Sequence, residues 1–398
     1  EEEPDEEPLP PILLAIPTRA LAFLEQSAHQ WDFDPFALTD MTGERPIRSM
    51  GLYLFHQFDL TDKFGIQLPV LEAFLDLVEE GYKRHGNPYH NCTHSADVAQ
   101  TCCFILSRHG LASWLSDIEV LALLFAALIH DFEHTGTTNN YHVQSRSQLA
   151  VVYNDKSVLE SYHVSAVFRK MHEQGPKYRQ FRSLVIEMVL ATDMSTHFAQ
   201  VTAMKDAIPC PENLPRVDIL AYILHAADIS HPAKIWRLHE RWTGKLTAEF
   251  FAQGDREKEL GLACSPLCDR DKTMVASSQV GFIEYIVEPC FHTLLQLLQS
   301  VKFLLNPPRQ TAPGADSNGE SGSSRGGDDE DGEVTGSRPT NPTPDTMDRL
   351  RDLHDWDVLS ILCSNRDRWR DLAESEKRRV AVIDEVNEEE EQEEEAEN

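Results

Sequence analysis

The stretch LALLFAALIHDFEHTGTTNN (121–140) begins with nine consecutive apolar residues, Leu121 to Ile129, and continues without a break into the polar sequence HDFEH. Nine apolar residues are too few to span a bilayer. The run is therefore predicted to form a helix buried in a protein core, and Gly136 is predicted to end it. The polar residues then lie directly against the apolar core.

The polar end of this helix contains a histidine–aspartate pair. On a continuing helix, His130 and His134 share one face, and Asp131 lies next to His130. Burying such a pair without a partner is costly, and a divalent metal ion would neutralise it. The structural alternative is a helix end with a satisfied histidine and a solvated acid, so partners elsewhere in the chain must decide.

The rest of the chain also shows a mainly helical pattern. After Arg48, apolar residues recur every three or four positions in most segments, whereas strand-type alternation is scarce. The segments with this spacing are 50–58, 69–84, 94–110, 116–132, 157–173, 177–193, 215–228, 235–253 and 274–299. We therefore predict an all-α fold, a compact multi-helix globule.

The chain is acidic, but its charge is unevenly spread. Of the formal net charge of −30, residues 1–7 contribute six acidic residues, and residues 309–398 hold 26 acidic against 11 basic residues. This leaves −9 for residues 8–308, in a chain that is 41% hydrophobic. Such a body is an ordinary acidic globule, which argues against nucleic acid or an anionic membrane as the main partner.

Cysteine usage and the N-terminal region indicate a cytoplasmic protein. Eight cysteines occur at irregular spacings without a C-x-x-C pair, so we expect reduced thiols rather than a disulfide framework. The apolar segment 9–24 is interrupted by prolines and an arginine and follows acidic residues, which is atypical of a secretory signal. No transmembrane span is expected.

Two other predicted helix ends offer matching metal ligands. The sequence HNCTH places His90 and His94 four residues apart near a helix start, where one helix face can present both, and HAADISHP ends a strongly apolar helix at Asp228. Three helix ends thus bring imidazole and carboxylate groups next to apolar segments. Because buried charges are normally paired or metal-bound, we favour a metal site over three unrelated structural features.

The ligand types narrow the choice of metal and of reaction. Nitrogen and oxygen ligands without thiolate suit zinc, manganese, magnesium or iron. A carboxylate next to a ligand histidine, as Asp131 is, can bridge two metal ions, which is a usual arrangement for phosphate-ester hydrolysis. A hydrolase also needs a proton donor for the leaving alkoxide, and His90, one turn from His94, fits that role.

Longer motifs surround these residues. They are YHNCTHSADV (89–98), HDFEHTGTTNNYH (130–142), LATDMS (190–195), HAADISHPAK (225–234), EFFAQGDREKELGL (249–262) and SQVGFIEYIVEP (278–289). Together they resemble the class I 3′,5′-cyclic-nucleotide phosphodiesterases, over roughly residues 31–305 and, through an N-R-x-x-W sequence, 355–372. HDFEHTGTTNN and ILHAADISHPAK look most like the calcium/calmodulin-dependent (type 1) branch.

The resemblance implies a compact all-α catalytic domain of the His-Asp metal-hydrolase type. We expect residues 1–30 to be an acidic segment leading into this domain, 31–306 to form its main part, and 347–375 to supply its last helix. Residues 307–346 are rich in Gly, Ser, Pro and acid and have almost no large apolar side chains, so we predict a disordered insertion. Residues 376–398 are predicted to be a solvated acidic tail.

The resemblance also implies a role for each site residue. The tighter ion, expected to be zinc (Zn²⁺), would be held by His94, His130, Asp131 and Asp228. Asp131 would also bridge to a more hydrated second ion, magnesium (Mg²⁺) or alternatively manganese (Mn²⁺). His90 takes the position of the family's proton donor. The residues that match positions orienting metal-bound water are His134, Glu160 and Asp193.

A purine pocket is implied as well. Its lining would comprise Gln279, Phe282, Leu246, Tyr89 and Met194. Gln279 matches a glutamine that bonds the purine edge, and Phe282, on the same helix face, matches a stacking aromatic opposed by Leu246. A carboxamide can present donor and acceptor in either order, and His231 stands where cAMP-selective branches tend to carry asparagine. We therefore predict hydrolysis of both cAMP and cGMP.

The expected partner is a cyclic-nucleotide substrate, with neither nucleic acid nor membrane; the oligomeric state is left open, with a homodimer as one option. In the type 1 branch, calmodulin acts through basic amphipathic segments before the catalytic domain. This chain opens on an acidic sequence, so calmodulin is expected to bind only through an upstream segment absent from it. Two alternatives remain: another His-Asp metal-dependent nucleotide phosphohydrolase, and a non-catalytic nucleotide-binding scaffold.

Overall fold

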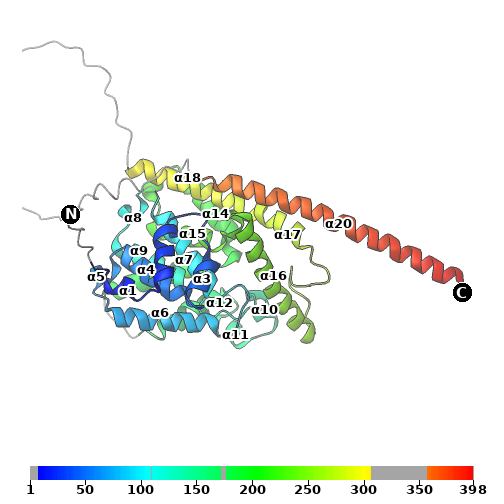
Figure 1. Ribbon diagram of the computed structural model, residues 1–398, viewed down its shortest axis with the longest axis horizontal. Coiled ribbons are helices and arrows are strands. Elements are labelled where there is room, and N and C mark those ends of the chain that lie inside the picture. Colours follow the sequence, from blue (N-terminus) through cyan, green and yellow to red (C-terminus); the bar gives the residue numbers. More distant parts are fainter. Residues whose placement is uncertain (1–7, 109, 172–175, 306–355, 398) are drawn as a thin grey trace, which may run out of the picture.

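The protein folds into helices. The computed structural model describes residues 8–108, 110–171, 176–305 and 356–397, and no strand occurs in these residues. The predicted all-α class is therefore confirmed. Figure 1 shows the helices packed into one rounded body, from which α20 (Val358–Glu397) extends as a long rod.

The helices follow one another through mostly short connections. Up to the HDFEH sequence they are α1 (Pro11–Leu14), α2 (Thr18–Ser27), α3 (Pro35–Met41), α4 (Pro46–Gln57), α5 (Leu60–Phe64), α6 (Leu68–Lys83), α7 (Cys92–Leu106), α8 (Leu111–Trp114) and α9 (Asp117–Ile129). After it come α10 (Asn139–Gln144), α11 (Gln148–Tyr153), α12 (Val158–Phe168), α13 (Pro176–Leu190), η1 (Met194–Thr196), α14 (His197–Ala207), η2 (Pro211–Asn213), α15 (Arg216–Asp228), η3 (His231–Ala233), α16 (Trp236–Glu259), α17 (Val275–Phe282), η4 (Ile283–Val287), α18 (Glu288–Leu305) and α20.

Two neighbouring helices, α7 and α9, form the centre of the core. Every residue of α7 is buried, and so is the whole run from Val120 to Ile129 in α9. α9 packs against α7, α13 and α15, while α7 also packs against α4 and α15. The apolar run is thus a buried helix, as predicted, and helices from both halves of the chain surround it.

The first helices belong to the same core. α1 and α2 bury Ile12 and Leu24 in the apolar cluster that also contains α4 and α9, and α1 and α2 both pack against α4. Residues 8–30, predicted to lead into the domain, therefore contribute to its interior. Burying apolar side chains in this way is the main stabilising term for a helix too short to be stable alone.

The C-terminal helix α20 also packs against the helical body. It packs against α17 and buries Leu362 and Trp369. The helix continues to Glu397, so the sequence predicted to be a solvated acidic tail is helical. The predicted insertion at 307–346 and the acidic residues 1–7 lie outside the described residues.

The end of α9 differs from the prediction. The helix stops at Ile129, so His130 and Asp131 lie in a turn. In a continuing helix the Asp131 N–H would donate to the carbonyl of Ala127. Instead, His130 Nδ1 donates to Ala127 O at 2.9 Å, and the Asp131 N–H donates to the hydroxyl of Tyr82 at 3.0 Å. Side chains have taken over the hydrogen bonds that would extend the helix.

Two predicted helix faces are therefore wrong. His130 and His134 do not lie on one helix face, because the helix ends before them and Glu133 between them has a left-handed backbone, with φ of 59°. His90 and His94 do not share one either, because α7 begins only after His90. In each case the residues meet through the tertiary fold and not through helical spacing.

The predicted helix at 274–299 is divided by a wider turn. α17 ends at Phe282, five residues of π-helix form η4, and α18 then continues the direction. Turns of this kind are rare and often occur at functional sites, because they shift side chains relative to a regular helix. Here the shift begins directly after Phe282.

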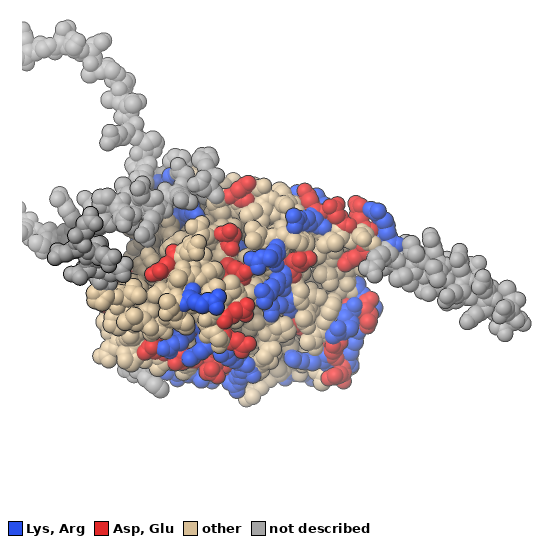
Figure 2. Space-filling view, viewed as in Figure 1, with Lys and Arg blue, Asp and Glu red and all other residues tan. Residues whose placement is uncertain are grey.

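The described helices can be compared with the length and apolar character of a membrane span. No described helix combines the length and the apolar character needed to cross a bilayer. On the face drawn in Figure 2, Lys and Arg side chains lie among Asp and Glu side chains.

The turn after α9 is packed tightly against α6 at Gly81. A Cβ atom on Gly81 would lie 1.9 Å from the ring of Phe132, which is fully buried. We expect Gly81→Ala to lower the free energy of unfolding by about 1–3 kcal/mol, because the ring must move. Gly244 in α16 meets nothing within 4 Å. Gly244→Ala should therefore be neutral or stabilise by up to about 1 kcal/mol. Urea unfolding of both variants measures the difference, and equal midpoints would contradict it.

Candidate metal centre and nucleotide pocket

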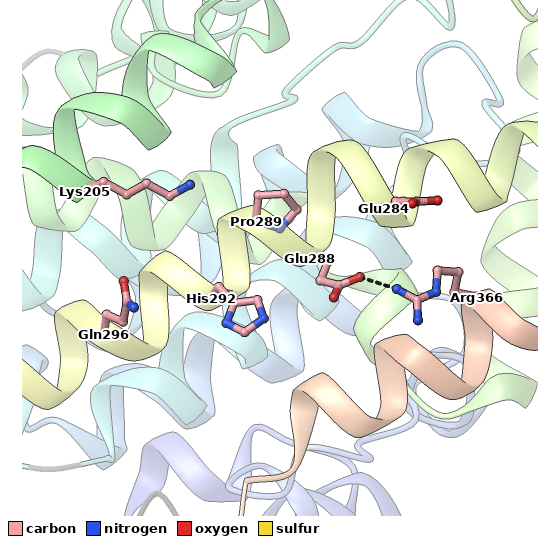
Figure 3. Close-up of a pocket in the computed structure, with 7 residues that line it drawn as sticks. All are labelled: Lys205, Glu284, Glu288, Pro289, His292, Gln296 and Arg366. Carbon is pink, nitrogen blue, oxygen red and sulfur yellow. Dashed lines mark hydrogen bonds and ion pairs between the residues drawn. The ribbon is translucent and has the colours of Figure 1, made fainter.

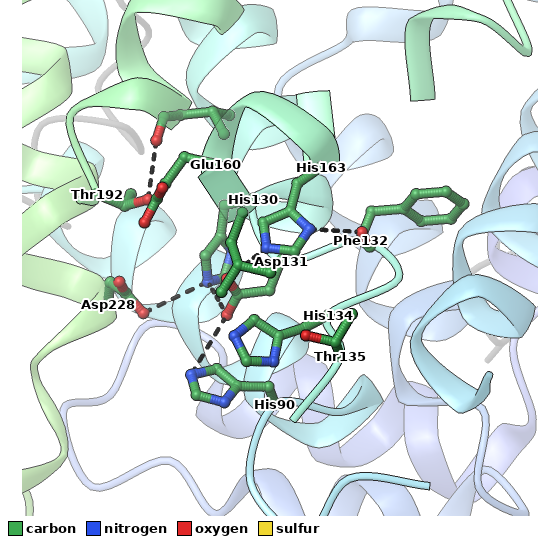
Figure 4. Close-up of polar contacts among 12 residues, drawn as sticks. His90, His130, Asp131, Phe132, His134, Thr135, Glu160, His163, Thr192 and Asp228 are labelled. Atoms are coloured by element: carbon green, nitrogen blue, oxygen red, sulfur yellow. Dashed lines mark hydrogen bonds and ion pairs between the residues drawn. The ribbon is translucent and has the colours of Figure 1, made fainter. Parts of the chain in front are cut away.

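Four side chains from three helix ends converge on one point. They are His94 at the start of α7, His130 and Asp131 after α9, and Asp228 at the end of α15, and their ligand atoms all lie within 4.8 Å of one another. His94 Nε2 lies 3.0 Å from Asp228 Oδ1 and 3.2 Å from His130 Nε2. His130 Nε2 lies 3.1 Å from Asp131 Oδ2. Figure 4 shows His130, Asp131 and Asp228 turned toward the same space.

The spacing of these atoms suits a metal ion at their centre. Of the other three pairs, His94–Asp131 and His130–Asp228 are both 3.4 Å apart. Two ligands bound to one ion at about 2.1 Å are separated by about 3.0 Å in octahedral and about 3.4 Å in tetrahedral geometry. All five distances fall in this range, so the four residues fit a divalent ion with nitrogen and oxygen ligands.

The hydrogen bond of His130 sets which nitrogen faces the cluster. A carbonyl oxygen only accepts, so the bond to Ala127 O places the proton of the neutral ring on Nδ1. Nε2 then presents a lone pair toward Asp131 and Asp228. Asp228 Oδ1 lies 3.0 Å from His94 Nε2 and 3.4 Å from His130 Nε2, so a carboxylate stands opposite these ring nitrogens. The cluster therefore offers lone pairs and negative charge together.

His90 lies beside this cluster and is bonded to Glu249 of α16. The ring Nδ1 contacts Glu249 Oε1, and the backbone N–H groups of Tyr89 and His90 donate to Oε2 at 3.0 and 3.1 Å. Burial by itself lowers the pKa of His90, but the charges of Glu249 and Asp131 outweigh it and raise the pKa to about 9. His90 Nε2, 3.9 Å from Asp131 Oδ2, is then the N–H that faces the cluster.

The residues predicted to orient metal-bound water have separate partners, and one of them, His134, lies in a group with Asp131 and His163 whose ligand atoms are within 4.8 Å of one another. His134 stacks on His90 with ring centroids 3.8 Å apart. Glu160 is held by the Asn139 amide at 3.0 and 3.1 Å, and burial raises its pKa to about 7. Asp193 accepts hydrogen bonds from the Ser157 hydroxyl at 2.7 Å and the Ser195 N–H at 2.8 Å. Each carboxylate is thus oriented by its own neighbours.

Sequence reasoning missed two buried groups in this region. His163 of α12 donates from Nδ1 to Phe132 O at 2.7 Å, and its Nε2 lies 3.8 Å from Asp131 Oδ1 and has no hydrogen-bond partner in the described part of the chain. Its position three residues after Glu160 on the same helix was the available signal. Glu249 begins the motif EFFAQGDREKELGL, but its residue type gives no signal of burial, because an acid on a long polar helix normally faces solvent.

The predicted purine-pocket residues are only partly brought together. Phe282 stacks near His231, with ring centroids 6.3 Å apart, and Tyr89 lies 5.9 Å from the same ring. Gln279 is buried and accepts a hydrogen bond from the Thr243 hydroxyl at 3.4 Å. Leu246 packs against the small apolar cluster that contains Tyr89.

Met194, the remaining predicted lining residue, begins η1 and is 42% exposed. It directly follows Asp193 in the chain. Its contribution to a nucleotide pocket stays a prediction.

A separate surface pocket lies on the outer side of α18. Its lining residues are Lys205, Glu284, Glu288, Pro289, His292, Gln296 and Arg366, and it contains none of the predicted site residues (Figure 3). Arg366 and Glu288 form an ion pair across it at 2.8 Å. Both signs of charge line the pocket, so its electrostatics favour neither an anionic nor a cationic ligand.

The sequence profile of the family described as "3'5'-cyclic nucleotide phosphodiesterase" matches residues 89–307, which contain all of these site residues. The chain belongs to this family. The family predicted from the motifs is thereby confirmed.

The chain is similar to several named relatives. It is 45% identical over 358 residues to a mouse "dual specificity calcium/calmodulin-dependent 3',5'-cyclic nucleotide phosphodiesterase 1C", covering 85% of this chain and 50% of that protein. It is 48% identical over 301 residues to a "probable 3',5'-cyclic phosphodiesterase pde-1" of Caenorhabditis elegans, covering 72% of this chain and 45% of that protein. The chain thus spans about half the length of the curated relatives it matches.

The fold is also similar to a solved structure. The phosphodiesterase domain of the RhoPDE fusion protein from the choanoflagellate Salpingoeca rosetta superimposes with a TM-score of 0.69 at 26% identity. The match covers 90% of this chain and 99% of that domain. The helical body described above therefore corresponds to a whole phosphodiesterase domain.

Proposed function

We propose that the protein hydrolyses 3′,5′-cyclic nucleotides, both cAMP and cGMP, to 5′-nucleoside monophosphates. The observation that carries this proposal is the convergence of four ligand atoms at metal-ligand spacing, with a hydrogen-bonded histidine directly beside them. Membership in the phosphodiesterase family supports the same reaction. The words "dual specificity" in the names of the relatives support activity on both nucleotides.

In this proposal, His94, His130, Asp131 and Asp228 would hold the tighter ion, zinc, and Asp131 would also be a ligand of a second ion, magnesium or manganese. When bound, such a metal pair activates a water molecule as the nucleophile and stabilises the charge that develops on the phosphate. His134, Glu160 and Asp193 orient water around the second ion. His163 Nε2, which is buried and has no partner among the described residues, would accept from the same water.

His90 is proposed to be the proton donor. Its Nδ1 is occupied by Glu249, and the pKa raised to about 9 keeps the ring protonated at neutral pH. The Nε2 proton is therefore available to the O3′ atom as its bond to phosphorus breaks. Without that proton the product would leave as a strongly basic alkoxide, which is a poor leaving group.

The base is proposed to lie between Phe282 and Leu246, with its edge toward Gln279. The purine-type pocket distinguishes this function from that of other His-Asp metal phosphohydrolases, which have no reason to share Gln279 and Phe282. We further propose a cytoplasmic location, which the free state of all eight cysteines supports. Calmodulin control, which the names of the relatives include, is proposed for this protein as well.

The test is an assay of the purified chain on cAMP and cGMP with metal analysis. We expect 5′-AMP and 5′-GMP as products, loss of more than about 100-fold of activity after removal of metal by a chelator, and recovery on adding zinc with magnesium. A chain that binds cyclic nucleotides but does not hydrolyse them would instead support the scaffold alternative. Hydrolysis of other nucleotide phosphates alone would support the phosphohydrolase alternative.

A further inference from the structure

One face of α16 is polar although it is buried. Glu249, Gln253 and Glu257 are spaced four residues apart, and their side chains are 3%, 1% and 2% exposed. Residues at this spacing lie above one another on a helix. Buried carboxylates and amides are costly unless every polar atom has a partner, so the partners of this face are informative. Glu249 holds His90, as described above.

Gln253 reaches the loop that precedes α10. Its Oε1 accepts from the Thr138 N–H at 2.8 Å, and its Nε2 donates to the Thr138 hydroxyl at 3.1 Å and to Glu257 Oε1 at 2.9 Å. A backbone N–H only donates and a carboxylate only accepts, so the chemistry of its partners allows just this orientation of the amide. Gln253 therefore connects the 138 loop to Glu257 with a fixed direction of every hydrogen bond.

Glu257 carries the connection to the loop after α16. Its Oε2 accepts from the Ser265 N–H at 2.7 Å, and its Oε1 accepts from the Ser265 hydroxyl at 2.6 Å. Because that hydroxyl donates to Glu257, it accepts from the Asn140 amide, which lies 3.1 Å away. Asn140 is two residues after Thr138, so the hydrogen bonds close into a ring that grips residues 138–140 at both ends.

The residue between these two contacts, Asn139, holds the Glu160 carboxylate. Asn139 donates from Nδ2 to both oxygens of Glu160 at 3.0 and 3.1 Å, and its Oδ1 accepts from the Leu159 N–H at 2.9 Å. Asn139 thus sets the direction of the Glu160 carboxylate. Its own backbone is set by the ring formed through α16.

We propose that Gln253 and Glu257 are positioning residues that act on the metal centre through Asn139 and Glu160. The inference rests on the proposed function, because it assigns Glu160 to water around the second ion. The three polar residues of α16 then have parallel tasks: Glu249 orients His90, Gln253 orients the 138 loop, and Glu257 fastens the 265 loop to it.

Solvent-exposed ion pairs fasten the same loop from outside and provide a matched control. Arg270 bonds Asp255 of α16 through Nε at 3.1 Å, with side chains 49% and 46% exposed. Exposed pairs of this kind contribute little, because water and salt screen them. Arg270→Ala therefore removes an exposed contact between α16 and the chain that follows it without touching the hydrogen-bonded ring.

The experiment compares Gln253→Glu, Glu257→Gln and the double swap in the 398-residue chain. Gln253→Glu places two carboxylates where Nε2 and Oε1 now lie 2.9 Å apart, and Glu257→Gln replaces an acceptor by a donor. The double swap again sets an amide against a carboxylate without changing the net charge. Amide hydrogen exchange across residues 136–141 and the kinetic constants for cAMP are measured for each, beside Arg270→Ala.

Each single variant is expected to speed exchange at Thr138 and lower kcat about 10- to 100-fold, the range for residues that orient ligands around a metal, with KM within about threefold. The double swap should return kcat to within about tenfold of the wild type, because the two sites interact. Arg270→Ala should stay within about twofold.

Single variants with unchanged kcat and exchange would overturn the proposal, and so would a double swap no better than the worse single variant. If the wild-type chain hydrolyses neither nucleotide, the proposed function is wrong. The exchange rates then decide separately whether the ring holds residues 138–140: unchanged rates in the single variants reject it, and faster rates restored by the swap retain it.

Discussion

Replacing Asp228 by alanine is expected to remove the tightly bound metal and to lower kcat for cAMP and cGMP by at least about 1,000-fold, well beyond the 10- to 100-fold typical of residues around a ligand. Asp228 Oδ1 is within 3.0 Å of His94 Nε2 and 3.4 Å of His130 Nε2. Its loss leaves one carboxylate, Asp131, to balance a dication. Metal content, measured by elemental analysis alongside the kinetics, should fall in parallel with kcat.

The control is Asp218→Asn in the same helix. Asp218 is exposed in the first turn of α15, whereas Asp228 ends that helix at the cluster. The control removes one negative charge from α15 and should retain metal and activity within about twofold, since substitutions at exposed sites are usually mild. An Asp228→Ala protein that keeps stoichiometric metal and normal turnover would contradict the ligand assignment.

Three of the four clustered residues could be found from the sequence pattern because they stand at chemically unusual places, whereas the choice of His94 rests on the resemblance to the family. His130 and Asp131 follow an uninterrupted apolar run, and Asp228 ends another apolar helix. Apolar helices must be buried, so their polar ends are buried too and need a common partner. This argument requires no knowledge of how the helices pack, and the structure brings all four predicted ligands within 4.8 Å.

What the sequence could not predict depends on tertiary contacts. The end of α9 is decided by Tyr82, which accepts the hydrogen bond of Asp131 N–H from another helix. No local pattern marks Tyr82 for this task. The burial of Gln253 and Glu257 could not be predicted for the same reason. A polar helix face normally faces solvent, whereas this face packs against loops of the protein. The partners of a polar residue, more than its type, determine what it does.

Replacing His90 by alanine is expected to lower kcat for cAMP about 100- to 10,000-fold, the usual contribution of a proton-transferring side chain, while bound metal is retained. His90 is not among the four clustered ligands, so the metal should stay. The stacked partner His134 and the hydrogen-bond acceptor Glu249 remain in place. Parallel measurements of zinc content and turnover separate this variant from Asp228→Ala, in which both should fall.

The choice of leaving group separates proton donation from a merely structural role. A nitrophenyl phosphodiester releases a weakly basic phenolate, which needs no proton as its bond to phosphorus breaks, whereas the O3′ of a cyclic nucleotide does. For that ester, His90→Ala should cost less than about tenfold, against the much larger loss with cAMP. Glu249→Gln should show the same pattern more weakly, because it removes the charge that keeps His90 protonated. Equal losses on both substrates would mean that His90 supports the fold of the site instead of supplying a proton.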